Sequence, residues 1–280
     1  MLLEVQDVSK IYGNSCGSCL ALTGEEHGSA ICPECASVVA INSISLTARK
    51  NEILGIVGES GSGKSTLLQL IYQDISASSG KIFFNGLTDD RNRPIKENIL
   101  KAMPATVSRL RNKEMSMIYQ NPHMGLNFLF SAGGNIAERI IGAGERNYEK
   151  IRKGALGFID RIDMETSRID DYPEDFSGGQ QQRIQIAKAL SSSPKLLLLD
   201  EPTTGLDVSV QAKILDLIKE LQQEIGFSMI IVSHDLGVIN HLTDITVVMK
   251  HGTLVEYGLT DQILEDPQHP YTQLLVSSIL

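Results

Sequence analysis

The residues with the clearest chemical signal form a glycine-rich turn in the first quarter of the chain. The turn follows the apolar run 53–57 and precedes a helix-like segment at 66–70. Its residues, with the first residue of the following helix, are Gly58, Glu59, Ser60, Gly61, Ser62, Gly63, Lys64, Ser65 and Thr66. A strand, a glycine-rich turn and a helix N-terminus in this order present backbone N–H groups and a helix dipole to an anion. Residues 58–65 are therefore predicted to be a phosphate loop that binds a nucleoside triphosphate.

Two side chains of the phosphate loop have roles of their own in this prediction. Lys64 is expected to reach the β- and γ-phosphates, and the Ser65 hydroxyl is expected to ligate Mg²⁺. The alternative, a structural glycine turn before a helix, is disfavoured because all the fixed positions and both flanking elements agree.

Two adjacent carboxylates end a strongly apolar segment. Residues 196–199 are four leucines, and Asp200 and Glu201 follow directly. Such a segment is typical of a central strand in a parallel sheet, whose carboxyl edge is where ligands bind. We expect Asp200 to hold Mg²⁺. The side chain of Glu201, the next residue, points to the opposite side of the strand and is expected to orient or deprotonate an attacking water.

Two polar residues follow further short strands. Gln120 follows the strand predicted at 115–119, and its amide is expected to bond both metal-bound water and the nucleophile. His234 follows the strand predicted at 228–233 and is expected to donate to the γ-phosphate. Taken singly, each is more simply a loop amide or a strand-end histidine, but their order after the phosphate loop favours the functional interpretation.

A second glycine turn and one aromatic residue complete the candidate nucleotide site. The turn, which again presents N–H groups at the start of a helix predicted at 181–190, consists of Ser177, Gly178, Gly179 and Gln180. Tyr12 lies upstream of the phosphate loop, after a strand predicted at 2–7. Its ring is either a packing aromatic or a surface on which a purine stacks.

The chain has four cysteines, and all of them lie in one short segment. They are Cys16, Cys19, Cys32 and Cys35, two Cys-x-x-Cys pairs separated by twelve residues. This spacing is typical of a tetrahedral zinc site, and iron or a pair of disulfides is the less favoured alternative. Because the segment interrupts a series of strands, we interpret residues 13–37 as an inserted structural element, the cysteine knuckle.

The elements that must position these residues alternate between strands and helices. Further strands are predicted at 38–48 and 81–84, and a closing hairpin at 245–249 and 253–257. Periodic apolar positions between 121 and 176 indicate a helical subdomain, with helices at 136–141 and 148–162. The pattern predicts an α/β fold, a single domain over residues 1–280 with the helical subdomain and the cysteine knuckle as insertions.

Composition limits the possible functions. Of the 280 residues, 42% are apolar and 21% are charged, as in an ordinary globular protein, and 34 acidic residues against 25 basic ones argue against a nucleic-acid partner. No apolar run is long enough to span a bilayer, and no signal-peptide pattern is present. We therefore expect a cytoplasmic protein that reaches the inner membrane only through a partner such as a permease.

The motifs taken together resemble those of the ATP-binding-cassette (ABC) ATPases over nearly the whole chain outside the cysteine knuckle. The resemblance implies a P-loop NTPase with a RecA-like core, an antiparallel β subdomain and a helical insertion. It implies ATP and Mg²⁺ as ligands, with Ser65, Gln120 and Asp200 around the metal. Tyr12 would stack on adenine, Gln120 would couple the nucleotide to a partner, Glu201 would be the catalytic base and His234 the switch histidine.

The resemblance also implies a dimer. In this family two cassettes pair head to tail, so that the signature motif, here Ser177–Gln180, closes over the nucleotide of a second subunit. That subunit is either another copy or a paralogue. The signature here begins with Phe176, where leucine is more usual.

Two subgroups of the family compete for the assignment. The segment 266–272 is shared with peptide and nickel importer cassettes, which work with a membrane permease. Segments 131–136, 168–171, 258–261 and 271–278 resemble the ATPase component of the phosphonate carbon–phosphorus lyase system, which predicts docking on the lyase core. The cysteine knuckle departs from that component, and a zinc-dependent interaction module on a cassette scaffold is a third hypothesis.

Overall fold

The computed structural model describes residues 1–88, 95 and 97–278. The chain forms two compact units, one made of Met1–Val107 with Ile230–Leu280 and the other of Ser108–Met229. Strand β7 (Ser228–Ser233) carries the chain from the second unit back into the first. Each unit is described below by itself.

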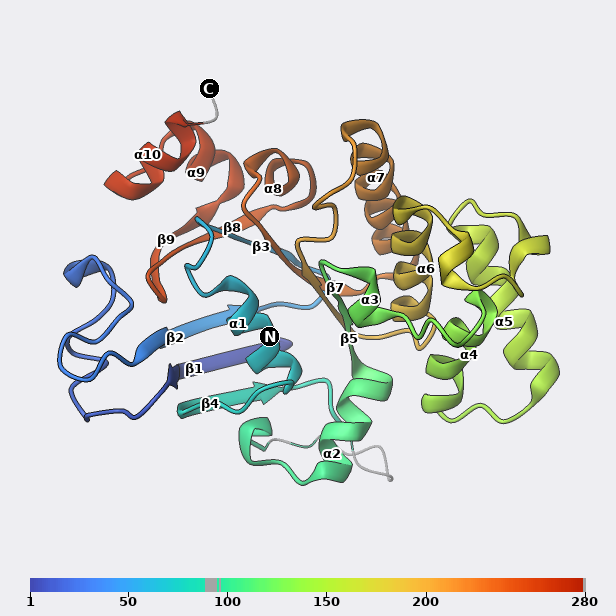
Figure 1. The fold of residues 1–280 in the computed structure, drawn as a ribbon, viewed down its shortest axis with the longest axis horizontal. Coiled ribbons are helices and arrows are strands. Elements are labelled where there is room, and N and C mark those ends of the chain that lie inside the picture. Colours follow the sequence, from blue (N-terminus) through green and yellow to red (C-terminus); the bar gives the residue numbers. More distant parts are fainter. Residues whose placement is uncertain (89–94, 96, 279–280) are drawn as a thin grey trace. The chain divides into compact units, whose positions relative to one another are not determined.

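The first unit contains a three-stranded antiparallel sheet in the order β2-β1-β4 (Figure 1). Its strands are β1 (Leu3–Tyr12), β2 (Val38–Ala48) and β4 (Ser79–Phe84). The strand predicted at 2–7 therefore continues to Tyr12, which pairs with Val38. Register shifts along β1 break the alternation of apolar residues, and the sequence pattern consequently indicated only its first half. The cysteine knuckle leaves this sheet after Tyr12, returns at Val38, and contains one 3₁₀ turn, η1 (Glu25–His27).

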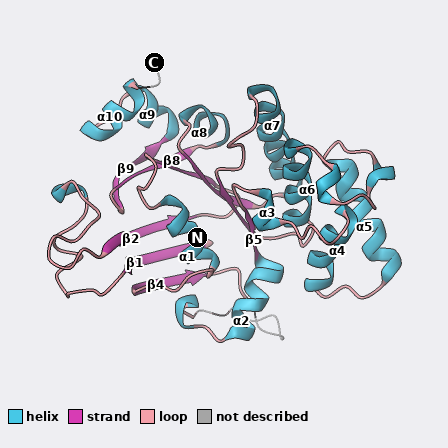
Figure 2. Cartoon of the chain, in the orientation of Figure 1, coloured by secondary structure: helices cyan, strands magenta, loops and turns pink. Residues whose placement is uncertain are grey.

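A second group of strands in this unit supports the phosphate loop. Strand β3 (Ile53–Val57), buried along its whole length, pairs in parallel with β8 (Ile245–Lys250). Strand β9 (Thr253–Leu259) pairs antiparallel with β8, which confirms the predicted hairpin. The helices of this unit, drawn in cyan in Figure 2, include α1 (Lys64–Tyr72), α8 (Leu236–Leu242), α9 (Thr260–Glu265) and α10 (Pro270–Ser277).

The second unit combines two parallel strands with a group of helices. The strands, β5 (Met115–Ile118) and β6 (Leu196–Asp200), are buried throughout. The helices are α3 (Pro122–Gly125), α4 (Ala132–Gly142), α5 (Tyr148–Arg161), α6 (Gly178–Leu190) and α7 (Val208–Ile225). Helices α4 and α5 confirm the two predicted in the helical subdomain, and α6 begins three residues earlier than predicted.

Short helical segments complete the chain. Helix α2 (Pro104–Arg109) spans the sequence boundary between the units. The remaining turns are η2 (Ile99–Lys101), the π-helical turn η3 (Leu110–Glu114), η4 (Thr166–Arg168) and η5 (Pro173–Asp175). Among the described residues, no helix combines the length and apolar character needed to cross a bilayer.

Candidate nucleotide-binding site and cysteine cluster

Lys64 lies inside its own phosphate loop. Its side chain is buried, with 4% of the residue exposed, and its Nζ donates to the carbonyl oxygens of Gly58 at 2.7 Å and Glu59 at 2.9 Å. Helix α1 begins at Lys64, so the positive end of the helix dipole and the ammonium group lie at the same end of the turn. This is the arrangement that binds an anionic group.

The backbone of strands β2 and β8 lies so close to the phosphate loop that two of its positions have room only for glycine. A Cβ at Gly58 would lie 2.2 Å from the carbonyl oxygen of Met249 in β8. A Cβ at Gly63, whose φ is +104°, would lie 2.3 Å from the carbonyl oxygen of Ala40 in β2. The Gly252 N–H also donates to the carbonyl of Ser62 at 3.0 Å. Neither glycine can be replaced without moving backbone.

Tyr271 contacts the phosphate loop from the far end of the chain. Its hydroxyl accepts the Glu59 N–H at 2.9 Å, and only 8% of the residue is exposed. Burial raises the pKa of Tyr271, so the hydroxyl keeps its proton at neutral pH. The sequence places Tyr271 in the segments 266–272 and 271–278 but does not predict this contact, since no spacing rule relates two residues 212 positions apart.

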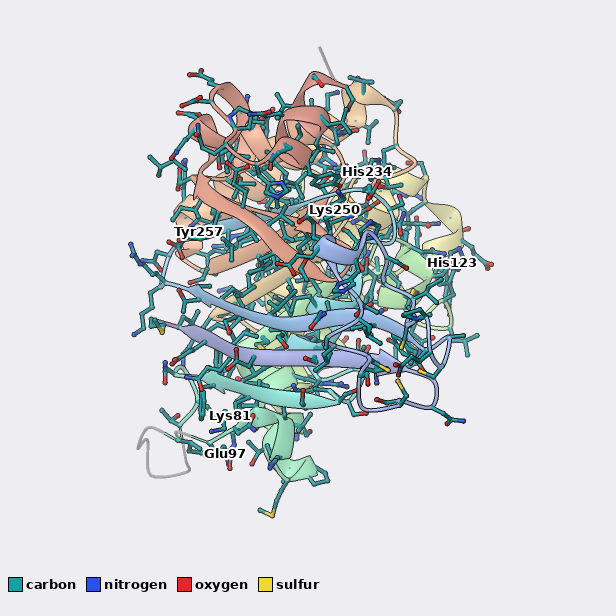
Figure 3. The ribbon with its side chains drawn as sticks, turned by 90° about the vertical axis from the view of Figure 1, so that its left-hand side faces the viewer. Lys81, Glu97, His123, His234, Lys250 and Tyr257 are labelled. Carbon is teal, nitrogen blue, oxygen red and sulfur yellow. The ribbon has the colours of Figure 1, made fainter. Side chains whose placement is uncertain are left out.

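The first unit also holds the predicted adenine and switch residues. Tyr12 ends β1 with 43% of its surface exposed, and Lys10 Nζ lies 4.9 Å from its ring centroid. His234 is exposed directly after β7 (Figure 3). Asp235 fixes the backbone beside it by accepting the Gly237 N–H at 2.7 Å and capping α8. Both predicted rings are thus accessible to a ligand.

In the second unit the structure brings Gln120 and Glu201 together. Gln120 Nε2 donates to Glu201 Oε2 at 3.5 Å, and the Thr204 hydroxyl donates to the same oxygen at 2.9 Å. Glu201 has a φ of +46°, an uncommon conformation for a residue with a side chain. Asp200, the preceding residue at the end of β6, is 8% exposed. The geometry agrees with a carboxylate and an amide that act on one water.

A buried glutamine of α6 holds the backbone of Tyr119, the residue before Gln120. Gln185, 1% exposed, accepts the Tyr119 N–H at 2.7 Å and donates to the Tyr119 carbonyl at 3.2 Å. The helix that starts at the signature motif is thereby joined to the start of the Gln120 loop. Sequence reasoning missed Gln185, because one glutamine within a helical pattern carries no signal of its partner.

The signature motif forms a reciprocal helix cap. Ser177 Oγ accepts the Gln180 N–H at 3.4 Å, and Gln180 Oε1 accepts the Ser177 N–H at 3.0 Å, which explains why α6 starts at Gly178. A Cβ at Gly179 would lie 2.7 Å from Val210, whereas one at Gly178 would have its nearest neighbour at 3.9 Å. A Cβ at Gly178 therefore fits without displacing a neighbour.

Asp207 caps the next helix, as predicted. It accepts the Ser209 hydroxyl at 2.7 Å and the Val210 N–H at 3.0 Å. These two hydrogen bonds lower the pKa of Asp207, and the carboxylate is therefore charged at the positive N-terminus of α7.

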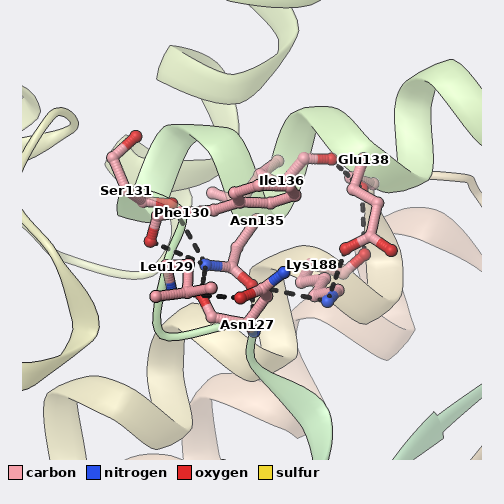
Figure 4. Close-up of polar contacts among 9 residues, drawn as sticks. Asn127, Leu129, Phe130, Ser131, Asn135, Ile136, Glu138 and Lys188 are labelled. Atoms are coloured by element: carbon pink, nitrogen blue, oxygen red, sulfur yellow. Dashed lines mark hydrogen bonds and ion pairs between the residues drawn. The ribbon is translucent and has the colours of Figure 1, made fainter.

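The segment that follows the Gln120 loop is held by the buried residue Asn135 (Figure 4). Its Nδ2 donates to the carbonyls of Asn127 at 2.9 Å, Ser131 at 3.1 Å and Phe130 at 3.2 Å, and its Oδ1 accepts the Asn127 N–H at 2.8 Å. One fully buried side chain thus fixes the loop before α4 and leaves Leu129 84% exposed.

The four cysteines form one cluster in the first unit. All four sulfurs lie within 4.8 Å of one another. The contacts Cys16–Cys19 and Cys16–Cys32 are 3.6 Å, and Cys19–Cys35 is 3.5 Å. Four sulfurs at the usual zinc–sulfur bond length form a tetrahedron with edges of about 3.8 Å, whereas a disulfide needs about 2 Å. The geometry fits a tetrahedral thiolate site.

Thiol chemistry in the cluster agrees with a cation site. Hydrogen bonds from Ser37, whose hydroxyl lies 3.2 Å from the Cys35 sulfur, lower the pKa of Cys35 to about 6. The Ser18 N–H favours the Cys16 thiolate, but burial and the other three sulfurs outweigh it and raise the pKa of Cys16 to about 12. The Cys35 thiolate therefore forms readily, whereas deprotonation of Cys16 requires a compensating positive charge.

Comparison with known proteins identifies the class. The ABC transporter family model matches residues 41–204, and the model for the C-terminal region of oligopeptide/dipeptide transporters matches residues 255–280. The chain belongs to the ABC transporter family and is an ABC ATPase subunit, which confirms the predicted fold class and activity.

Two curated relatives represent the two predicted subgroups. The chain is 48% identical to the putative phosphonates utilization ATP-binding protein PhnK of Escherichia coli K12, over 82% of this chain and 87% of the relative. It is 37% identical to the dipeptide transport ATP-binding protein DppF of the same organism, over 86% of this chain and 69% of the relative. The resemblance to the phosphonate system is thus confirmed.

Solved structures have the same fold. A dimeric structure of the ATP-binding cassette MJ0796, in a post-hydrolysis state bound to ADP and Pi, matches with a TM-score of 0.75 and 26% identity, covering 92% of this chain and 99% of that one. The structure of CbiO1 of Clostridium perfringens, part of the ABC transporter complex CbiONQ, matches with a TM-score of 0.73 and 27% identity, covering 95% of this chain and 91% of that one.

Proposed function

We propose that this chain is the ATP-hydrolysing subunit of a phosphonate-utilisation system and works on a carbon–phosphorus lyase core. The observation that carries this proposal is the 48% identity to a relative named for phosphonates utilization, sustained over 87% of that relative's length. The dipeptide relative is less similar, at 37%, and the match spans 69% of its length.

The ATP site in this proposal begins at the phosphate loop. Lys64, now bonded to its own loop, turns to the triphosphate when ATP binds, and Tyr12 stacks on the adenine ring. Mg²⁺ has hard oxygen donors available in the Ser65 hydroxyl, the Gln120 amide and the Asp200 carboxylate. When bound, the ion neutralises charge on the phosphates.

Hydrolysis in this proposal depends on Glu201, Gln120 and His234. Glu201 accepts a proton from the attacking water, while Gln120, 3.5 Å from its carboxylate, orients the same water. The Thr204 hydrogen bond keeps the carboxylate in one rotamer. His234 donates to the γ-phosphate and so distinguishes ATP from ADP.

The working unit in this proposal is a dimer. The start of α6 offers Ser177, Gly178 and Gly179, and no atom lies closer than 3.9 Å to a Cβ built at Gly178, which suits a surface that covers the nucleotide of a second subunit. The similar cassette MJ0796 is described as dimeric.

The partner surface in this proposal follows directly on the Gln120 loop. Three large apolar side chains between residues 121 and 131 are exposed: Met124 at 65%, Leu129 at 84% and Phe130 at 45%. Exposed apolar residues close together in the chain favour docking to a protein. The lyase core would be this partner in the cytoplasm, with no nucleic acid involved.

A second candidate is the ATPase subunit of a peptide- or nickel-type importer. The match of residues 255–280 to the C-terminal region of oligopeptide/dipeptide transporters favours it. In that case the exposed apolar residues would contact a membrane permease, and the chain would be recovered with membranes.

Affinity purification from the native host distinguishes the two candidates. The tagged chain is expected to bring down subunits of the lyase core, and Leu129→Asp is expected to reduce this recovery without changing ATP binding. Deletion of the gene should abolish growth on a phosphonate as sole phosphorus source and leave growth on phosphate intact. Recovery of permease subunits with no lyase subunit would overturn the proposal in favour of the importer.

We also propose that Cys16, Cys19, Cys32 and Cys35 bind one structural Zn²⁺. The sulfur contacts of 3.5 and 3.6 Å support it, and thiolate ligands select zinc over harder divalent cations. Metal analysis should find one zinc per chain, and the Co²⁺-substituted protein should show the absorption of a tetrahedral thiolate site. Cys16→Ser should lose both signals while Glu26→Gln keeps them. A purified chain without zinc, and without a Co²⁺ signal, would contradict the site.

A further inference from the structure

One chain of hydrogen bonds links the cysteine knuckle to the phosphate loop through strand β2. The side-chain amide of Asn42 donates to the carbonyls of Leu20 at 2.9 Å and Thr23 at 3.1 Å, both in the knuckle. The Asn42 backbone N–H donates to the carbonyl of Gly252 at 2.8 Å, and Gly252 in turn donates to Ser62 at 3.0 Å. Asn42 therefore holds the knuckle and also contacts Gly252, the residue whose N–H bonds the phosphate loop.

A second chain of contacts runs through residues 266–272, here called the C-terminal tail. Glu25 lies in the knuckle turn between the two cysteine pairs, and its Oε1 is 3.6 Å from Lys250 Nζ and 3.7 Å from His269 Nε2. Lys250, at the end of β8 (Figure 3), has its Nζ 4.7 Å from the ring centroid of Tyr271. Both partners of Glu25 are thus connected to Tyr271, Lys250 through its contact with the ring and His269 as a near neighbour in the chain.

The orientation of His269 agrees with this contact. Its Nδ1 accepts the Tyr271 N–H at 3.2 Å, so the neutral ring carries its proton on Nε2, the atom that faces Glu25. The backbone on either side is fixed by Glu256 in β9, which accepts the N–H groups of Gln268 at 2.8 Å and His269 at 3.0 Å. The start of α10, and with it Tyr271, is therefore held in place.

At the loop, one peptide group is held from both sides. The N–H of the Gly58–Glu59 peptide donates to Tyr271 at 2.9 Å, and the carbonyl of the same peptide accepts Lys64 Nζ at 2.7 Å. When Lys64 turns to a triphosphate, the peptide loses its bond to Lys64 and keeps the one to Tyr271. Tyr271 is then the side chain that preserves the orientation of this part of the loop.

We propose that Tyr271 is a positioning residue for the phosphate loop, and that the cysteine knuckle sets its position through Glu25 and supports the loop through Asn42. Zinc bound at the cysteines and nucleotide bound at the loop then strengthen each other's binding. This inference rests on the two ligand sites proposed above. Because binding linkage is reciprocal, both affinities must change by the same factor.

The exposure of the participants determines the expected size of each effect. The side chains of Glu25, Lys250 and His269 are 25% to 31% exposed, so Glu25→Gln should weaken nucleotide binding only about twofold to threefold. The Tyr271 hydroxyl is buried, and its removal leaves the Glu59 N–H without this acceptor. Tyr271→Phe should therefore weaken nucleotide binding about fivefold to tenfold.

The first experiment uses the zinc-loaded full chain and a non-hydrolysable ATP analogue. Dissociation constants are measured for Tyr271→Phe with Tyr257→Phe as its control, because Tyr257 is 60% exposed on the adjoining strand β9. Glu25→Gln is compared with Glu26→Gln, the neighbouring exposed carboxylate. The two controls should bind as the wild type does, and the double variant of Glu25 and Tyr271 should lose less than the product of the single effects.

The second experiment measures the linkage itself. Zinc affinity is determined by competition with a chelator, with and without the analogue, and the analogue should tighten zinc binding in the wild type by the factor by which zinc tightens analogue binding. In Tyr271→Phe this factor should be smaller than in the wild type, because only the route through Asn42 remains. The zinc readout requires no hydrolysis.

The possible outcomes distinguish a failure of the linkage from a failure of the proposed zinc or nucleotide site. A chain that binds no zinc, or no nucleotide, overturns the corresponding site and the linkage with it. A chain that binds both ligands with independent affinities overturns the linkage alone. Linkage that is equally strong in the wild type, Tyr271→Phe and Glu25→Gln overturns the route through these residues.

Discussion

The amide of Gln120 lies 3.5 Å from the carboxylate of Glu201, although 81 positions separate the two residues in sequence. Glu201 reaches this position with a left-handed φ of +46°, and the Thr204 hydroxyl fixes the same carboxylate oxygen at 2.9 Å. An uncommon backbone conformation that persists beside a polar cluster is a feature of functional sites. In the proposed mechanism, this pair is where the attacking water is oriented.

Glu201→Gln should keep ATP binding and lose at least about 100-fold in turnover, because an amide of the same shape cannot accept a proton. Steady-state phosphate release and equilibrium nucleotide binding are measured on the same preparation. Glu149→Gln, at an exposed position of α5, is the control and should hydrolyse ATP at the wild-type rate. Sustained hydrolysis by the Glu201 variant would contradict its assignment as the base.

Lys64→Ala should lose nucleotide binding itself. The substitution removes the buried cation that donates to the Gly58 and Glu59 carbonyls, and with it the positive charge closest to the N-terminus of α1. Nucleotide affinity is expected to fall by at least about tenfold, which calorimetry can measure. Lys50→Ala, at an exposed position before β3, should bind normally. Equal affinities in the two variants would refute the role of Lys64.

Gly178→Asp should abolish dimerisation and leave the fold of the chain intact. A Cβ at Gly178 would have its nearest neighbour at 3.9 Å, so the monomer accepts the side chain, and a carboxylate at the start of α6 suits the helix dipole. The same carboxylate would repel the triphosphate of a second subunit. Sedimentation with ATP in the Glu201→Gln background should show a dimer that Gly178→Asp converts to monomer. Gly178→Asn, without the charge, should have a smaller effect, and a dimer that survives Gly178→Asp would contradict the proposed role of the signature motif.

Much of the candidate site could be predicted because its signals are local. The phosphate loop lies within eight consecutive residues, and the spacing of the two cysteine pairs predicted that their four sulfurs form one cluster. Glu201 and His234 were identified because each directly follows an apolar strand. In each case the signal lies within a few consecutive residues or at the end of one apolar segment.

The residues that were missed act through contacts distant in sequence. Tyr271 meets Glu59 across 212 positions, and Gln185 meets Tyr119 across 66. Such pairs depend on how helices pack, and a single tyrosine or glutamine carries no periodic signal of its partner. The length of β1 was underestimated for a related reason, since its irregular register hides the alternation on which the prediction depended.

Gln185→Leu should loosen the Gln120 loop. Leucine fills a similar volume, but the hydrogen bonds to the N–H and to the carbonyl of Tyr119 are both lost, and the expected cost is about 1–3 kcal/mol of unfolding free energy. Denaturant unfolding measures this cost, and hydrogen exchange around residues 119–121 should accelerate. Gln223→Leu, at an exposed position of α7, should change stability by less than about 0.5 kcal/mol. If both variants unfold alike, the contact is not holding the loop.

Glu256→Gln should release the C-terminal tail from β9. Burial acts to raise the pKa of Glu256, but the hydrogen bonds from the Gln268 and His269 N–H groups help to lower it below the ordinary value of 4.5. The contribution of the carboxylate to stability is therefore complete at neutral pH and is lost only as the pH falls through that lowered pKa.

At pH 7 the variant should show faster hydrogen exchange from residue 266 to 272, because an amide accepts these hydrogen bonds less strongly than a carboxylate. Glu265→Gln, at an exposed position of α9, is the matched control. Since Tyr271 lies in the released segment, nucleotide binding should weaken in Glu256→Gln and stay unchanged in the control. An unchanged exchange rate in Glu256→Gln would show that contacts other than those of Glu256 hold the tail.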